Sequence, residues 1–234
     1  DKVSYLGTSY SGGYHVFFTR KEAGLDSLEK LRAASGLKIG SQSVGHLIYI
    51  SGRMFAHLMG LKQPRFVTGY TSPELDVAIE AGEIDTRSTV ADALLHEKPQ
   101  WVDKNLMDFH ALIEIPKGKK HAHPRFAELP DIESFAKSDL ERKLVRLYRT
   151  FVARGNPFIL PPGTAKERVQ VAQEAMRKTY KDPEFSKEYT KITGLKAEPQ
   201  MPEELERTIK EMPRDREAVE LFKKLSGPDP LPQR

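Results

Sequence analysis

The sequence contains no cysteine. This excludes a thiolate zinc site, an iron–sulfur centre and a cysteine nucleophile, because each of them needs a cysteine thiolate. The absence does not identify a cellular compartment, since disulfides are optional in oxidising environments. Long apolar runs are also missing. The longest, residues 47–55, is interrupted by Ser51, Gly52 and Arg53 and is far shorter than the roughly 18–20 residues that span a membrane.

A strong excess of one charge is absent as well. The 234 residues include 37 Lys and Arg against 33 Asp and Glu, and the formal net charge of +4 is spread along the chain. This balance does not indicate nucleic-acid binding and is compatible with a small anionic ligand. No signal-peptide pattern is present. The sequence could begin at a processed, truncated or partly observed start, so this absence does not indicate a cytoplasmic protein.

Strand-like and helix-like segments alternate through the first half of the sequence. The spacing of apolar residues and the Gly and Pro positions predict helices there at 25–31, 46–59 and 73–81. Alternation with short connections is typical of a parallel α/β layer. The C-terminal third instead predicts helices at 169–180, 183–193, 202–212 and 218–225, followed by a frayed tail at 228–232. Strands are expected at 3–6, 14–18, 37–40, 65–68, from 84, at 109–115 and at 151–153, and 116–130 as a loop.

The loop 40–45 is the strongest candidate site, because it joins an expected strand to an expected helix. The first turn of a helix has N–H groups without partners and carries partial positive charge. Hydroxyls of Ser41 and Ser43 add donors, so a carboxylate or phosphate would be held well. An ordinary turn with Ser43 as N-cap is the alternative. It is not a Walker loop, since His46 and Leu47 stand where Lys and Ser or Thr are needed.

Three weaker patterns leave alternatives open. Ser9 lies in a segment similar to a serine-hydrolase elbow, but the expected strand at 15–18 leaves no helix to cap it. His121 and His123 could bind a metal, although a solvated loop fits better and no metal site is expected. Arg87, expected just after a strand end, could pair with a ligand carboxylate or with Asp85 at the surface.

A series of short motifs runs through almost the whole chain in a characteristic order. These segments are Val3–Gly7, His15–Phe18, Ile39–Gly45 with the following helix, Phe66–Leu75, Ala81–Asp85, His110–Leu112, Phe126–Ile132, Pro161–Thr164, Asp182–Phe185, Gly194–Pro199 and Pro202–Leu205. Each motif alone is weak, but the ordered series resembles the substrate-binding receptors of tripartite tricarboxylate transporters, the Bug-type periplasmic receptors.

The resemblance implies an α/β periplasmic-binding-protein fold of type II, with two lobes and a hinge. Residues 15–147 would form the complete second lobe, and residues 1–14 and 148–234 the hinge and part of the first lobe. The family has an upstream α/β stretch that this sequence lacks, so the first lobe would be incomplete. His46-Leu47-Ile48-Tyr49 also replaces the family's usual Ser/Thr/His group.

The resemblance also implies a function. The chain would be a periplasmic, non-enzymatic receptor that captures a small carboxylate for two membrane components of a transporter. It would need no cofactor, bind no nucleic acid and be a monomer, and the lobes would close over the solute. The ligand contacts carried over are Ser41, Gln42, Ser43, Gly45 and His46 from the first loop, Tyr70 and Thr71 from the second, and Ser9 near the hinge.

Two alternatives remain beside this interpretation. One is an α/β hydrolase that uses Ser9, which a helix directly after Ser9 with a His and an acid nearby would support, and a strand at 15–18 would refute. The other is a truncated receptor-like module that serves interaction or sensing without binding a solute. Convergent N–H groups at 41–45 and 69–71 in a deep cleft would count against it.

Overall fold

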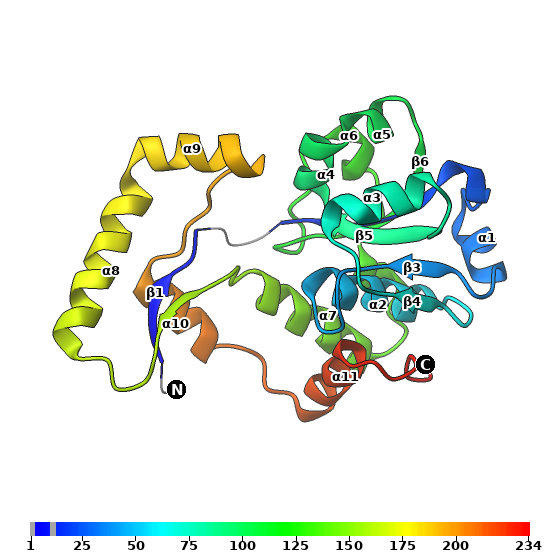
Figure 1. The fold of residues 1–234 in the computed structure, drawn as a ribbon. Coiled ribbons are helices and arrows are strands. Elements are labelled where there is room, and N and C mark those ends of the chain that lie inside the picture. Colours follow the sequence, from blue (N-terminus) through cyan, green and yellow to red (C-terminus); the bar gives the residue numbers. More distant parts are fainter. Residues whose placement is uncertain (1–2, 10–12) are drawn as a thin grey trace. The chain divides into compact units, whose positions relative to one another are not determined.

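A computed structural model describes residues 3–9 and 13–234, and these form two compact units (Figure 1). The first unit comprises Asp1–Gly13 and Leu147–Pro213, and the second comprises Tyr14–Arg146 and Arg214–Arg234. The division into lobes predicted from the sequence assigns all of 148–234 to the hinge and the first lobe. The structure differs here, because the last segment, from Arg214, packs with the second unit.

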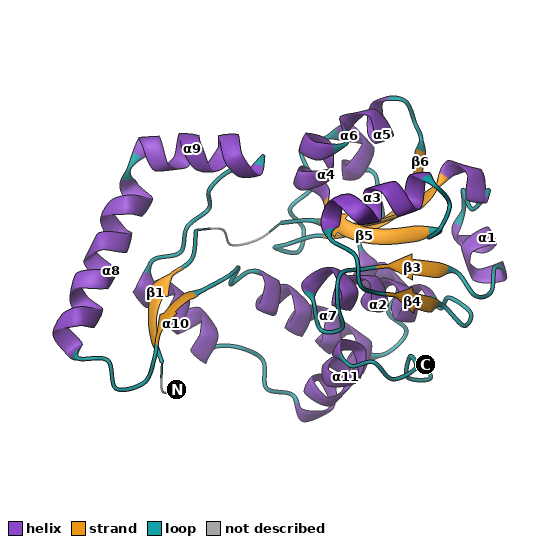
Figure 2. Cartoon of the chain, viewed as in Figure 1, coloured by secondary structure: helices purple, strands orange, loops and turns teal. Residues whose placement is uncertain are grey.

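A five-stranded sheet organises the second unit, with strand order β4-β3-β5-β2-β6 (Figure 2). The strands are β2 (His15–Arg20), β3 (Lys38–Gly40), β4 (Arg65–Val67), β5 (Thr86–Val90) and β6 (Met107–Ile113). Pairs β4–β3 and β3–β5 are parallel, whereas β2 is antiparallel to both β5 and β6. The expectation of a parallel layer is therefore wrong for two of the four strand pairs in this sheet. Only β2 runs opposite to the other four strands, because helices return the chain in the same direction from β3 to β4, from β4 to β5 and from β5 to β6.

Two consecutive aromatic residues on β2 pack against helices on the two faces of this sheet. Phe17 and Phe18 point to opposite faces because side chains alternate along a strand. The Phe17 ring stacks on Phe55 at 5.2 Å between centroids, and the Phe18 ring lies 5.8 Å from that of Trp101. All four side chains are buried. The second unit is thus an α/β/α layered core.

Two helices of this unit follow the predicted boundaries closely. Helix α2 (Leu47–Met59) begins after His46, whose Nδ1 accepts a hydrogen bond from the N–H of Ile48, and ends at Gly60, which adopts a left-handed conformation with φ of 74°. Helix α3 (Ser72–Glu80) has Pro73 in its first turn. The N-cap of α2 is His46, so the alternative with Ser43 as N-cap is wrong.

Two further helices of the second unit were predicted, α1 (Leu28–Ala33) and α11 (Arg216–Ser226). The helical elements that were not predicted are η1 (Lys21–Ala23), α4 (Ala91–Glu97), α5 (Pro99–Asp103), α6 (Pro124–Ala127) and η2 (Ile132–Phe135). Helix α6 lies within 116–130, where only a loop was expected. Helix α7 (Asp139–Val152) spans the boundary between the units. The strand expected at 151–153 is therefore wrong. Leu144 and Tyr148, four residues apart and fully buried, give α7 the apolar stripe that such helices need.

The first unit is built around a two-stranded antiparallel sheet of β1 (Ser4–Gly7) and β7 (Phe158–Leu160). Thr8 and Gln200 extend it, since each main-chain N–H donates to the other residue's carbonyl at 3.1 Å. Helices α8 (Lys166–Lys181), α9 (Pro183–Thr193) and α10 (Pro202–Lys210) complete the unit, as predicted. Leu205 of α10 is fully buried in this unit.

The C-terminal tail is held against the second unit, which corrects the expectation of a frayed end. Arg53 Nη2 donates to the carbonyl of Asp229 at 2.6 Å, and Arg234 Nε donates to Glu141 Oε1 at 2.5 Å. The sequence could not show this, because both partners are distant in the chain. No helix among the described residues is long and apolar enough to cross a membrane.

Candidate functional site

The loops that follow β3 and β4 lie together at the carboxyl ends of two parallel strands. In α/β sheets this edge is where ligands bind, because the helices that follow the strands begin there. The N–H of Ser41 donates to the carbonyl of Val67 at 2.9 Å, and the N–H of Gly69 donates to the carbonyl of Gln42 at 2.7 Å. These bonds bring the two predicted ligand loops together.

The first loop presents unpaired main-chain donors at the start of α2. Within the described part of the chain, the N–H groups of Ser43, Val44 and Gly45 donate to no protein acceptor, and all three residues are exposed. The carbonyl of Ser43 accepts from the N–H of His46 at 3.1 Å, which fixes the turn. The partial positive charge of a helix N-terminus lies at the same place. The loop can therefore bind an anion mainly through its backbone.

Ser41 and Gln42 form the inner wall of this loop. Ser41 is 1% exposed, and its Oγ has no hydrogen-bond partner among the described residues. Gln42 Nε2 donates to Ser72 Oγ at 3.0 Å, and Gln42 Oε1 is buried without a partner. Gln42 thus connects the two loops through both its main chain and its side chain. Sequence reasoning missed Ser72, although Pro73 at the helix start was a signal for its position.

His46 is exposed and serves as a helix cap with its Nδ1. Desolvation lowers the pKa of the His46 ring, which favours the neutral imidazole that this acceptor role requires. Because Nδ1 accepts, the neutral ring carries its proton on Nε2. His46 can therefore donate one hydrogen bond to a ligand while it caps α2.

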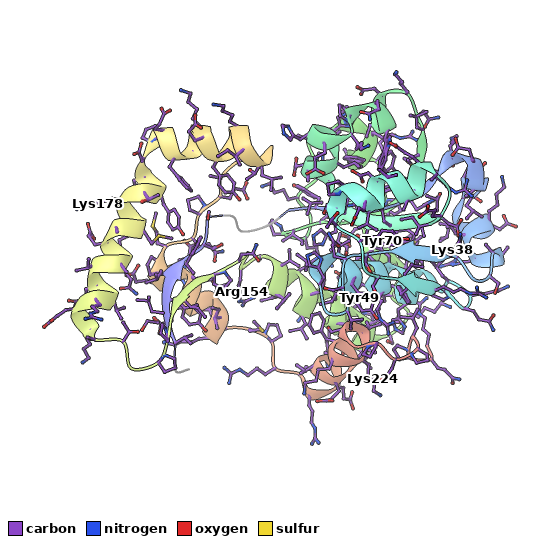
Figure 3. All side chains as sticks on the ribbon, in the orientation of Figure 1. Lys38, Tyr49, Tyr70, Arg154, Lys178 and Lys224 are labelled. Carbon is purple, nitrogen blue, oxygen red and sulfur yellow. The ribbon has the colours of Figure 1, made fainter. Side chains whose placement is uncertain are left out.

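In the second loop, the donor groups of Thr71, a predicted ligand contact, already make hydrogen bonds within the protein. The main-chain N–H and the hydroxyl of Thr71 both donate to Glu74 Oε2, at 2.7 and 2.8 Å. These bonds lower the pKa of Glu74, so a negative charge remains beside Thr71. Tyr70, labelled in Figure 3, packs partly against the core. A carboxylate is therefore better placed near Ser43–Gly45 than near Thr71.

A buried ion pair made by Arg87 stabilises this edge of the sheet. It lies inside β5 and not after a strand end, and it is 3% exposed, so neither a surface pair nor a ligand contact describes it. Its Nη1 contacts Asp76 Oδ1 at 2.5 Å, and its Nη2 donates to Thr89 Oγ1 at 3.1 Å. The pair fixes α3 against β5, and with it the loop that precedes α3.

Ser9 belongs to the first unit, whereas all other predicted contacts belong to the second. Residues 10–12, which would have to begin the helix of a hydrolase elbow, lie outside the described residues. Strand β2 begins at His15, which is the outcome that refutes a catalytic Ser9.

His121 and His123 were expected in a solvated loop, and this expectation is wrong for His121. Its side chain is 5% exposed, and its Nε2 lies 3.2 Å from Asp92 Oδ1. Among the described residues no cluster of three metal-ligating side chains occurs.

Comparison with solved structures identifies the class of fold as that of the periplasmic solute-binding proteins. BugD, a periplasmic binding protein, superposes with a TM-score of 0.61 at 15% identity, over 96% of this chain and 70% of its own. The α/β periplasmic-binding-protein fold predicted from the sequence is confirmed. No protein-family model matches the chain, and no curated protein sequence does.

More particularly, a Bug protein and a TctC protein are among the similar structures. Two others are Rpa4515 of R. palustris with adipate (TM-score 0.59, 14% identity) and MatC of Rhodopseudomonas palustris with bound malate (TM-score 0.59, 12% identity). A TctC solute binding protein from Polaromonas is similar too, with a TM-score of 0.57 at 12% identity. Each of these three comparisons covers 96% of this chain and 69% of the other.

Proposed function

We propose that the chain is a periplasmic solute-binding receptor of the tripartite tricarboxylate transporter family, which captures a small carboxylate for membrane transport components. The observation that carries this proposal is the pair of loops after β3 and β4, joined by the Gly69–Gln42 bond, with unpaired N–H groups at the start of α2. The fold supports it, and so do the adipate and malate found in two structures that share the fold.

In this proposal the ligand carboxylate is held by the N–H groups of Ser43–Gly45 and by the Ser43 hydroxyl. Gln42 orients the loop, Ser41 offers a buried hydroxyl, and His46 donates from Nε2. Tyr70 and Thr71 form the opposite side, where Glu74 limits how closely a second negative charge approaches. Ser9, the remaining predicted contact, belongs to the first unit and stays a prediction. Charge-assisted hydrogen bonds to main-chain donors are the strongest contacts available to such a site.

The same proposal assigns residues 15–147 to one lobe and 1–14 with 148–234 to the hinge and other lobe, with α11 and the tail packing on the former. The receptor acts as a monomer, and it binds without catalysing a reaction. Closure of the lobes would present a surface to the membrane components.

Calorimetric titration of the full chain with adipate and malate tests the proposal. Saturable binding of a dicarboxylate is expected, and Ser43→Trp should weaken it by about 1–3 kcal/mol, because the bulky ring displaces the carboxylate from its donors. Val77→Trp is the matched control, since Val77 is 63% exposed on α3 and is not among the predicted contacts. Equal affinity of the two variants would remove the loop from the site. The absence of binding to any tested carboxylate would favour an interaction module instead.

A further inference from the structure

One face of helix α2 packs against the C-terminal segment of the chain, and both belong to the second unit. Tyr49, Arg53 and His57 recur every four residues, so they lie on the same face of the helix. The opposite face packs on the sheet, where the Phe55 ring stacks on Phe17. Helix α2 is therefore held between the sheet and the segment that contains α11 (Figure 1).

The first two residues of this face hold the main chain that follows α11. The Tyr49 hydroxyl donates to the carbonyl of Gly227 at 2.8 Å, and Arg53 Nη2 donates to the carbonyl of Asp229 at 2.6 Å (Figure 3 labels Tyr49). Tyr49 and Arg53 are 2% and 1% exposed, so water does not compete strongly for either bond. Both contacts use main-chain carbonyls, and they therefore fix the path of the segment itself.

A buried carboxylate fixes the far end of the same segment. Arg234 Nε and Nη2 contact the two oxygens of Glu141 at 2.5 and 3.2 Å, and Glu141 is 4% exposed. Such a bidentate pair is among the strong charge-assisted contacts. His57 Nε2 lies 3.9 Å from the same carboxylate. Residues 227–234 thus form a strap across α2 that is anchored at both ends.

The near end of the strap adjoins the first ligand loop. A Cβ atom on Gly45 would lie 3.9 Å from the carbonyl oxygen of Ser226, which is an ordinary van der Waals contact. Val44 and Pro228 line one cavity of about 870 Å³. Tyr49 lies in the first turn of α2, directly after this loop. Its bond to the strap therefore fixes the start of the helix at the place where the unpaired main-chain donors are found.

We propose that Tyr49 is a positioning residue for the carboxylate site: through its hydroxyl, the strap holds the first turn of α2 and the N–H groups of Ser43–Gly45 in the arrangement that binds the ligand. This inference rests on the receptor function proposed above. On its other side the loop is held by the bond from Gly69 to Gln42. A site made of main-chain donors depends on such supports, because ordering a mobile loop on binding costs conformational entropy.

Tyr49→Phe tests this role in the full chain. It removes only the hydroxyl and keeps the ring against Phe66, whose centroid lies 5.7 Å away. The heteronuclear NOE of the N–H groups of Ser43–Gly45 should fall in the free protein, because the loop gains motion on the picosecond to nanosecond timescale. Calorimetric titration with adipate should give a dissociation constant about three- to tenfold higher than that of the unaltered chain.

Ser51→Ala is the matched control. It also removes one hydroxyl from α2, but on the face that packs on the sheet, where Ser51 Oγ donates to Ser88 Oγ at 2.8 Å. It should leave the NOE values unchanged and the affinity for adipate within about twofold. Unchanged NOE values or affinity in Tyr49→Phe, or equal changes in the two variants, would overturn the positioning role.

Failure of the proposed function would look different. In that case the unaltered chain would bind neither adipate nor malate. The NOE comparison needs no ligand, so it would still decide whether the strap holds the loop: lower values in Tyr49→Phe alone would support the strap, and equal values in the two variants would contradict it.

Discussion

The two units bury their sheets to very different extents. In the second unit, Phe17 and Phe18 of the interior strand β2 are fully buried between helices on both faces. In the first unit, Phe158 and Ile159 of β7 are 48% and 51% exposed, and no residue of α9 is buried. The second unit therefore has a complete core of its own and provides a rigid support for the two ligand loops.

The largest expected difference between the units concerns core aromatics. Phe17→Ala should lower the free energy of unfolding by about 3–5 kcal/mol, because it opens a cavity against Phe55. Phe158→Ala should change it by less than about 0.5 kcal/mol, since this side chain is half exposed. Urea unfolding followed by the fluorescence of Trp101 measures both. Similar losses from the two variants would show that the first unit buries Phe158 in solution.

A second test concerns the buried pair beneath the loops. Arg87→Met should destabilise the second unit by about 3 kcal/mol, because Asp76 is left buried without its counter-ion. The double variant Arg87→Met with Asp76→Leu should recover most of this loss, since it removes the unpaired charge. Thermal unfolding of the two variants measures the difference. A double variant as unstable as the single one would mean that packing, and not charge, explains the effect.

The pH response should also separate the units. Burial lowers the pKa of His15 and His110 from 6.5 to about 4, and all seven histidines belong to the second unit. At pH values between 6.5 and 4 the unfolded chain binds protons that the folded chain excludes, so stability is lost as the pH falls. At pH 5.5 each of these two histidines should cost roughly 1 kcal/mol.

Hydrogen exchange at pH 7.5 and 5.5 resolves this response by region. Protection should fall in β2 and β6 and change little in β1 and α10. His110→Gln, which replaces the ring that lies 2.9 Å from Thr19 Oγ1, should reduce the pH dependence. A first unit that loses protection equally would contradict the assignment of acid sensitivity to the buried histidines.

The smallest effects concern helix caps. His46→Ala removes the cap of the buried helix α2 and should cost about 1 kcal/mol of global stability. Asp182→Ala removes the bond from the N–H of Glu184 to Asp182 Oδ1, at 2.9 Å, at the start of the exposed helix α9. It should increase hydrogen exchange in α9 with little change in the global midpoint. A global loss from Asp182→Ala would mean that α9 folds together with the core.

Local chemistry made part of the fold predictable. The β-rich run of β2, bounded by turn residues, and the glycine after α2 act within a few residues, so they are visible in the sequence. The antiparallel direction of β2 is decided by its long-range pairing with β5 and β6, and the alternation of strands and helices along the sequence does not indicate it. The sequence predicts a frayed end at 228–232, because the residue that anchors it, Arg53, is 176 residues away from Asp229 in the sequence.

The candidate site was predictable to a similar degree. The main-chain donors at Ser43–Gly45 follow from the position of a loop before a helix, whatever its side chains. The engagement of Thr71 by Glu74 could have been recognised from their spacing of three residues, which is typical of a capping box. The pairing of Arg87 with Asp76 depends on how α3 packs on β5, and no local pattern encodes it.

The most direct test of the account is an amide NMR titration of the full chain with adipate. The account predicts that the N–H signals of Ser43, Val44 and Gly45 shift with a common saturation curve, while those of Ala56 and Leu61, at and just beyond the C-terminal end of α2, do not move. Saturable binding of adipate that leaves the signals of Ser43–Gly45 unchanged would contradict it.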